Sequence, residues 1–226
     1  MRYTDLRRGR RVVLAGGELA LPPGVVVALV GANGAGKSTL LMALARVLAP
    51  CGGTAEAWRD GGPVRQLGYV PQRPAFPSWL PLGQALALHG APPAVVAVLG
   101  LASADGARLL ARPASALSPG QTQALATAVA LARDDPLVLL DEPFAGVDLA
   151  RREALRALVA ARRARQPDAV LILSSHVAAD LDALCDWVVA LREGRCVFQG
   201  PRDALPSAPG REDGGTLEAR LAALTG

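Results

Sequence analysis

A glycine-rich run of eight residues constrains the fold of this chain more than any other feature. The run extends from Gly31 to Ser38, reads GANGAGKS and matches the pattern GxxxxGK[ST]. It directly follows an apolar stretch of strand length, residues 25–30, and directly precedes a helical pattern, which is the context that the motif requires. Glycines let the backbone wrap around a phosphate group, and the helix presents its positive N-terminus to the same anion. The run therefore predicts a nucleotide-binding loop between a buried strand and a helix.

The side chains at the end of this run have predicted roles. Lys37 is expected to reach the β- and γ-phosphates, and the hydroxyl of Ser38 is expected to bind Mg²⁺. Lys37 is the only lysine among 24 basic residues, in a composition whose Arg bias is typical of a GC-rich coding sequence. A planar guanidinium is a poor substitute for a compact ammonium under a tight loop. We expect nucleotide contacts from Gly31, Asn33, Gly34, Ala35, Gly36, Lys37, Ser38 and Thr39.

Two acids follow a second apolar run. Residues 137–140 read LVLL and are followed by Asp141 and Glu142. Acids at the carboxyl edge of a parallel sheet lie where ligands bind in open α/β folds. We expect Asp141 to belong to the Mg²⁺ shell, directly or through water, and Glu142 to polarise a water molecule in line with the γ-phosphate.

The chain alternates strand-like and helix-like segments. Residues 25–30, 137–141 and 169–174 read as strands, each followed by a helical pattern, over residues 38–48, 149–165 and 177–184. This alternation predicts a mostly parallel sheet with helical crossovers. Between residues 80 and about 116 the pattern changes to short Ala/Leu-rich helices, which indicates a helical insertion. Residues 206–215 read as a linker, and residues 216–224 as a short helix capped by Thr216.

Composition argues against several other classes of protein. The net charge of +4 is spread over the chain, and the basic clusters at residues 7–11 and 151–165 are interpreted as solvated faces, so no nucleic-acid partner is expected. No apolar run approaches the ~20 residues that span a bilayer, and no secretory signal is recognised, so a cytoplasmic location is expected. Cys51, Cys185 and Cys196 lie far apart without a CxxC pattern and are expected to be buried hydrophobes.

Six motifs resemble the ATP-binding cassette (ABC) ATPase family, over roughly residues 8–205, and they occur along the chain in the order that the family has. Besides the two motifs above, the resemblance rests on LSPGQ at residues 117–121, which is similar to the LSGGQ signature, and on Gln72, Asp148 and His176. The resemblance implies an α/β fold: a P-loop NTPase core with a mostly parallel sheet, a small N-terminal antiparallel β part and an inserted α-helical subdomain at about 80–133. Residues 1–205 would form this domain, and residues 206–226 a linker and short helix.

The resemblance also implies roles for the remaining motif residues. Gln72 would reach Mg²⁺ and the attacking water, and His176 would contact the γ-phosphate, so the catalytic set is Glu142, His176, Gln72 and Lys37 and the Mg²⁺ set is Ser38, Gln72 and Asp141. Asp148 matches the D-loop aspartate. In the family, the signature of one subunit closes over the ATP of another, so Ser118, Gly120 and Gln121 would act on a second nucleotide-binding subunit, identical or merely similar.

Two positions depart from the family pattern. Pro119 replaces the usual glycine of the signature, which removes one backbone donor but leaves the serine and the N–H of Gly120. This predicts that ATP-driven dimerisation is preserved but weaker. The aromatic residue that usually stacks on adenine is also missing, and Arg8 stands about where it is expected. An Arg plane can stack on a base, and Tyr3 is a less well-placed candidate.

The resemblance implies ATP-driven transport by separate membrane permease subunits, with this chain at the cytoplasmic face of the membrane. Phe76, Trp79 and Leu80 are candidates for the permease contact, with packing in a local core as the equal alternative. C-terminal motifs resemble exporter ATPases that pair with separate permeases, so export is favoured; they are SSH at residues 174–176, LCD at 184–186, LREGR at 191–195 and FQG at 198–200. An importer ATPase for a small solute or a metal ion remains an alternative, and a soluble ABC ATPase without a transport role is a further one.

Overall fold

The computed structural model describes residues 1–8, 11–48, 54–59, 62–100, 103–175, 177–207 and 216–225, with only the backbone at residues 7, 8, 11, 103, 178, 179 and 225. The central sheet has six strands, in the spatial order β13 (Arg195–Pro201), β12 (Trp187–Arg192), β5 (Val26–Val30), β11 (Val170–Ser174), β10 (Leu137–Asp141) and β9 (Gly68–Val70). All neighbouring pairs are parallel except β12 and β13, which form an antiparallel hairpin. The predicted mostly parallel sheet is confirmed.

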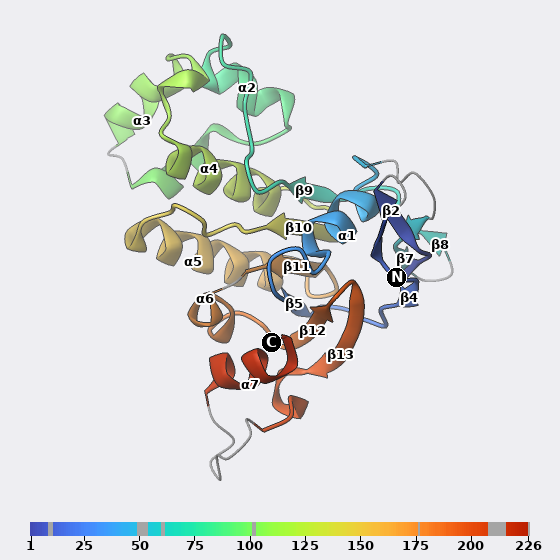
Figure 1. Cartoon of the computed structure of the whole chain (residues 1–226). Helices are drawn as coiled ribbons and strands as arrows, with labels where there is room; N and C mark the ends of the chain where they lie inside the picture. The colour runs from blue at the N-terminus through green and yellow to red at the C-terminus, as the bar shows by residue number, and fades with distance from the viewer. Residues whose placement is uncertain are drawn as a thin grey trace.

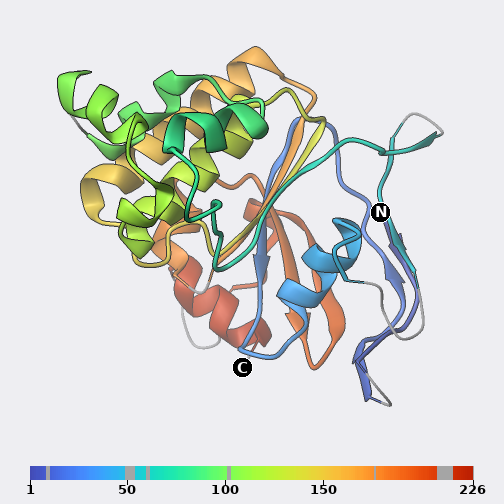
Figure 2. The ribbon, with the colours of Figure 1, turned by 90° about the horizontal axis from the view of Figure 1, so that it is seen from above.

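Small antiparallel sheets flank the central one. They consist of β4 (Gly17–Glu18), β1 (Arg2–Tyr3) and β6 (Ala55–Glu56), of β2 (Leu6–Arg8) with β3 (Arg11–Leu14), and of β7 (Trp58–Arg59) with β8 (Gly62–Pro63). The expected N-terminal antiparallel part is therefore present, on the same side of the central sheet as α1 (Figure 2).

The helices and short 3₁₀ segments (η) of the described residues are α1 (Lys37–Leu44), α2 (Leu82–Leu88), η1 (Pro93–Leu99), α3 (Ser103–Leu110), η2 (Ala114–Ala116), α4 (Pro119–Ala132), α5 (Leu149–Arg165), α6 (Ala178–Asp182), η3 (Arg202–Ala204) and α7 (Leu217–Thr225). Figure 1 shows α2 and α3 beyond α4, on the side of it away from the sheet. Among the described residues no single helix has the length and apolar character to span a membrane, and α2 and η1, bent by 116°, pass that test only as a pair.

Alternating side chains of the buried strands divide the core into two layers. Val27 and Leu29 of β5 pack with α1 and the N-terminal strands, whereas Val26 and Ala28 pack with α4, α5, α6 and α7. This alternation follows from the two-residue period of a strand, and both faces are apolar because helices or strands cover both. A third apolar cluster joins α2, η1, α4 and α5.

Several predicted boundaries need correction. The helix expected over residues 38–48 ends at Leu44, and Arg46 takes a left-handed φ of 57°. One of the short helices expected between residues 80 and 116, at Pro93–Leu99, is a 3₁₀ helix, and the helix expected over residues 177–184 is shortened to α6. Cys185 is buried as expected, Cys196 is only partly buried, and Cys51 lies outside the described residues.

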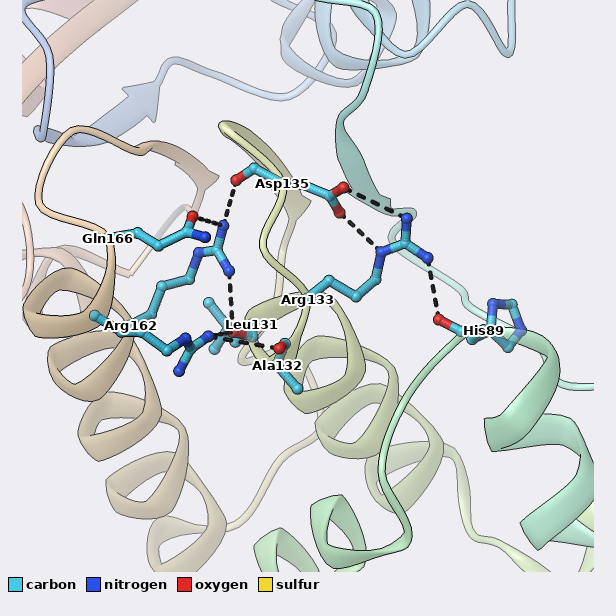
Figure 3. Close-up of polar contacts among 8 residues, drawn as sticks. His89, Leu131, Ala132, Arg133, Asp135, Arg162 and Gln166 are labelled. Atoms are coloured by element: carbon cyan, nitrogen blue, oxygen red, sulfur yellow. Dashed lines mark hydrogen bonds and ion pairs between the residues drawn. The ribbon is translucent and has the colours of Figure 1, made fainter.

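Hydrogen bonds from two arginines, Arg162 and Arg133, join the C-terminal ends of α2, α4 and α5 (Figure 3). The Arg162 side chain of α5 is fully buried and donates hydrogen bonds to the carbonyl oxygens of Leu131 (3.2 Å) and Asp135. Arg133 pairs with the buried carboxylate of Asp135 (2.8 Å) and donates to the carbonyl oxygen of His89 (3.0 Å) at the end of α2. These contacts attach the C-terminal end of α4 to α5 and to α2.

Candidate nucleotide-binding site

A cleft of about 1150 Å³ lies beside the glycine-rich run, at the carboxyl end of β5. It is lined by Val12, Val13, Ala32, Asn33, Gly34, Ala35, Gly36, Lys37, Ser38, Thr39, Gln72, Glu142, Arg192, Glu193 and Gly194. The carboxyl edge of a parallel sheet is where open α/β folds bind ligands. The cleft thus brings most of the predicted nucleotide-binding residues together with Gln72 and Glu142.

The glycines of the run are required by the shape of the loop. Gly34 and Gly36 have φ values of 82° and 106°, which L side chains rarely adopt. A Cβ atom on Gly31 would lie 2.4 Å from the carbonyl oxygen of Leu191 in β12. The loop can therefore pack against the sheet edge and leave its backbone open to the cleft only with glycine at these positions.

Lys37 begins α1 and is 8% exposed. Its ammonium group donates hydrogen bonds to the carbonyl oxygens of Gly31 (2.7 Å) and Ala32 (3.2 Å). Burial lowers the pKa of Lys37, and the nearby carboxylates of Glu142 and Asp141 oppose that change. Because an ammonium has three donors, two carbonyl contacts leave one donor for an anionic ligand.

Ser174, which belongs to none of the predicted site sets, holds the two predicted acids. Ser174 at the end of β11 is paired with Asp141 in the parallel register. Its hydroxyl donates to Oδ1 of Asp141 (2.6 Å) and accepts a hydrogen bond from the backbone N–H of Glu142 (2.9 Å). The signal for this role is a serine at the end of an otherwise apolar strand, but its partner is visible only once the register is known.

Four signature residues, at positions 117–120, line a second groove together with Gln72, Pro74 and Gly146. Ser118 caps α4, with its Oγ accepting from the N–H of Gln121 (3.2 Å) and Gln121 Oε1 accepting from the N–H of Ser118 (2.9 Å). Pro119 occupies the first helical position, where a missing N–H breaks no hydrogen bond within the helix. Ser118, Gly120 and Gln121 do not line the cleft of their own chain.

The remaining predicted site residues are not among those that line the cleft. Asp148 is the N-cap of α5, and its Oδ1 accepts a hydrogen bond from the N–H of Arg151 (3.1 Å). His176 and the side chain of Arg8 lie outside the described residues. Tyr3 is only 4% exposed and packs in the core, so it is not available to a base, whereas Val12 and Val13 line the cleft.

The oxygen-bearing side chains at the site fit Mg²⁺. Ser38 and Gln72 line the cleft, and the buried carboxylate of Asp141 is oriented by the 2.6 Å hydrogen bond from Ser174. Within the part of the chain that the structure describes, no group of three or more His, Cys, Asp or Glu residues forms a metal cage. This combination suits Mg²⁺, which binds through few carboxylates together with substrate phosphates.

Known proteins resemble this chain in sequence and in fold. A family profile described as ABC transporter matches residues 14–145. The zinc import ATP-binding protein ZnuC of Pseudomonas aeruginosa is 36% identical over 193 residues, which cover 84% of this chain and 70% of ZnuC. The hemin import ATP-binding protein HmuV of Nocardia farcinica is 37% identical over 213 residues, covering 86% of this chain and 73% of HmuV.

Two solved structures share the fold. One, described as the ATP-binding subunit of an ABC transporter, has a TM-score of 0.79 and 27% identity and covers 99% of this chain and 98% of its own. The other, a dimeric ATP-binding cassette described as bound to ADP and Pi after hydrolysis, has a TM-score of 0.70 and covers 88% of this chain and 97% of its own. At 19% identity, the second likeness concerns the fold alone.

Proposed function

The chain belongs to the ABC transporter family of ATP-binding subunits, and from this premise we propose that it powers an importer of a small solute or a metal ion. As an ABC ATPase it binds and hydrolyses ATP. The proposal adds the roles of individual residues, the partners and the direction of transport.

The geometry of the cleft supports a division of roles among its residues. The loop amides and Lys37 would bind the phosphates, with Lys37 already held at 2.7 Å from the carbonyl oxygen of Gly31. Ser38, Gln72 and Asp141 would hold Mg²⁺, which when bound neutralises developing phosphate charge. Glu142 would orient and polarise the attacking water, and this step needs no covalent intermediate with the protein. His176 is proposed to contact the γ-phosphate, on the family pattern alone.

Two copies, or this chain and a similar one, are proposed to enclose two ATP molecules. Ser118 and Gly120 line a groove separate from their own cleft, which supports their action on the nucleotide of a partner. Closure driven by the γ-phosphate and reopening after hydrolysis would form a two-state switch.

Separate membrane permease subunits are proposed to bind at the helical part, on the cytoplasmic face of the membrane. Trp79 is 77% exposed and Leu88 is 73% exposed, so both are available to a partner. Phe76 instead packs partly against the core of the helical part and forms an edge-to-face contact with His89 (5.6 Å between ring centroids). Of the two expectations for these aromatic residues, the exposure of Trp79 supports the permease contact.

The direction of transport rests on one observation. C-terminal motifs favoured export, but ZnuC and HmuV, at 36% and 37% identity over more than four-fifths of this chain, are both named as import ATPases. Their names support the importer alternative over export. The cargo is selected by residues of the permease. Since the relatives are named for zinc and hemin, these two are the first transport substrates to test.

The test uses the complete transporter in sealed vesicles, with this chain on the outer face. The lumen is loaded with labelled Zn²⁺ or hemin, and ATP and Mg²⁺ are added outside. An importer moves its cargo toward the side that carries the ATPase, so we expect ATP to empty the vesicles. Vesicles with the Glu142→Gln variant are the control. ATP-driven uptake into the lumen would contradict import and restore the export reading.

A further inference from the structure

The backbone at Glu142 is held in an unusual conformation. Its φ of 51° lies in the left-handed region, where a residue with a Cβ atom is disfavoured. Such a conformation persists only when surrounding contacts hold it, and at functional sites the contacts that do so are part of the mechanism. The contacts of the two peptide groups that flank Glu142 therefore decide where its carboxylate points.

Both peptide groups are held by buried polar side chains. The N–H of Glu142 donates to Oγ of Ser174 (2.9 Å). The carbonyl oxygen of Glu142 accepts two hydrogen bonds, one from the backbone N–H of Ala145 (3.1 Å) within the turn and one from Nε2 of Gln123 (3.3 Å) on α4. Ser174 is fully buried and Gln123 is 3% exposed. Because a buried amide without a partner costs free energy, the side chain of Gln123 is stabilised by this contact, which links α4 to the peptide group after Glu142.

Gln123 also belongs to the helix that carries the signature. It lies in the second turn of α4, whose N-terminus is capped by Ser118. The first turn of α4 contacts the segment after Glu142 as well, since a Cβ atom on Gly120 would lie 2.3 Å from the carbonyl oxygen of Gly146. A displacement of the N-terminal end of α4 therefore acts on the segment from Glu142 to Gly146 at two points.

We propose that Gln123 is a positioning residue that couples the location of α4 to the orientation of the Glu142 carboxylate. The inference rests on the proposed function, in which α4 closes over the nucleotide of a partner and Glu142 polarises water. When α4 is seated against the partner, the amide of Gln123 holds the carbonyl of Glu142 and fixes the base in its working geometry. Occupancy of one nucleotide site is thereby transmitted to the base of the other.

The test compares Gln123→Met with the unaltered chain. Methionine keeps the length and apolar volume of glutamine but donates no hydrogen bond. We expect kcat for ATP to fall about tenfold, which is the loss of one such contact in the transition state, with KM for ATP unchanged. Thr127→Val is the matched control, because Thr127 is buried one turn further along α4 and its hydroxyl makes no hydrogen bond; its kcat should equal that of the unaltered chain.

The same substitution in the Glu142→Gln variant distinguishes a positioning role of Gln123 from a general structural role. In Glu142→Gln, single-turnover hydrolysis is slow, and adding Gln123→Met should leave it unchanged, because Gln123 acts through the carboxylate that is already absent. An equal fall in both backgrounds, or an unchanged kcat in the single variant, would overturn the inference. Full turnover by Glu142→Gln alone would overturn the proposed role of Glu142 and this inference with it.

Gln123→Glu keeps the shape of the side chain and serves if the methionine variant does not fold. A buried carboxyl group has a raised pKa and donates a hydrogen bond only when it is protonated. The ratio of its kcat to that of the unaltered chain should rise as pH falls from about 8 to about 6. A ratio that is constant with pH would contradict the proposed hydrogen bond.

Discussion

The ammonium group of Lys37 lies 2.7 Å from the carbonyl oxygen of Gly31. This hydrogen bond joins the end of the phosphate loop to its first residue. This contact places the only lysine of the chain beside the first residue of the loop. The loop is thus preorganised for an anion, since its ammonium needs no large movement to reach a phosphate.

Labelling with an amine-reactive reagent tests this arrangement. The chain offers two amines, Lys37 and the α-amino group of Met1, and burial lowers the pKa of both. Mg-ATP should reduce labelling of Lys37 in proportion to the occupied fraction of the site. Met1 is the internal control, because its amine donates to the carbonyl oxygen of Leu19, away from the cleft, and its labelling should not change. Labelling of Lys37 that ignores bound nucleotide would contradict the site.

Gly120→Ala tests the close approach of α4 to Gly146, in the segment between Glu142 and Asp148. The new Cβ atom would meet the carbonyl oxygen of Gly146 at 2.3 Å, and overpacking of this kind costs about 1–3 kcal/mol of unfolding free energy. Gly106→Ala is the control, since that helical glycine has its nearest neighbour at 3.5 Å and alanine should stabilise α3 by up to about 1 kcal/mol. Urea midpoints measure both changes. Similar midpoints for the two variants would mean that α4 does not touch Gly146.

Local patterns were sufficient to predict part of this fold. The helix predicted over residues 149–165 has those bounds as α5, because Asp148 caps its start and its buried residues Leu155 and Val159 face the core. Strand β10 was also predicted with its observed bounds. Strands β9, β12 and β13 were not identified: β9 has only three residues, and β13 alternates exposed and partly buried positions at the sheet edge.

Within the candidate site, motif residues were predictable from the sequence, whereas the residues that hold them were not. Motif residues along one loop, such as Lys37 and Ser38, are recognisable because their spacing is local. Ser174 and Gln123 were missed, since their contacts with Asp141 and Glu142 join positions 33 and 19 residues apart and depend on strand register and helix packing. The roles of the motif residues stay predictions until the variants are measured.

Alkaline pH should unfold the protein through its two tyrosines. Burial, assisted by Cys196 for Tyr3 and by Asp141 for Tyr69, raises the pKa of each phenol to about 12. The folded state therefore retains these protons longer than the unfolded chain, so stability is constant below the unfolded pKa near 10 and falls as pH rises toward 12. Tyrosinate absorbance and circular dichroism should change together. Titration of both phenols near 10 with the helices intact would contradict the burial of these side chains.

Arg162→Met tests the buried arginine contacts of Figure 3. Removing the guanidinium leaves the carbonyl oxygens of Leu131 and Asp135 without this donor, which should cost at least about 2 kcal/mol of unfolding free energy. Arg163→Met is the control on the next residue, whose 3.0 Å pair with Asp186 is exposed and worth about 1 kcal/mol or less. Equal urea midpoints would show that the buried contacts add nothing beyond a surface ion pair.

The central claim is that this chain hydrolyses ATP with Glu142 as the residue that polarises water, in a dimer closed by ATP. The most direct measurement is turnover together with light scattering of Glu142→Gln at saturating Mg-ATP. The account predicts a fall in turnover of at least about a hundredfold, with nucleotide affinity retained and the mass of a dimer. Undiminished turnover, or a monomer at saturating ATP, would contradict it.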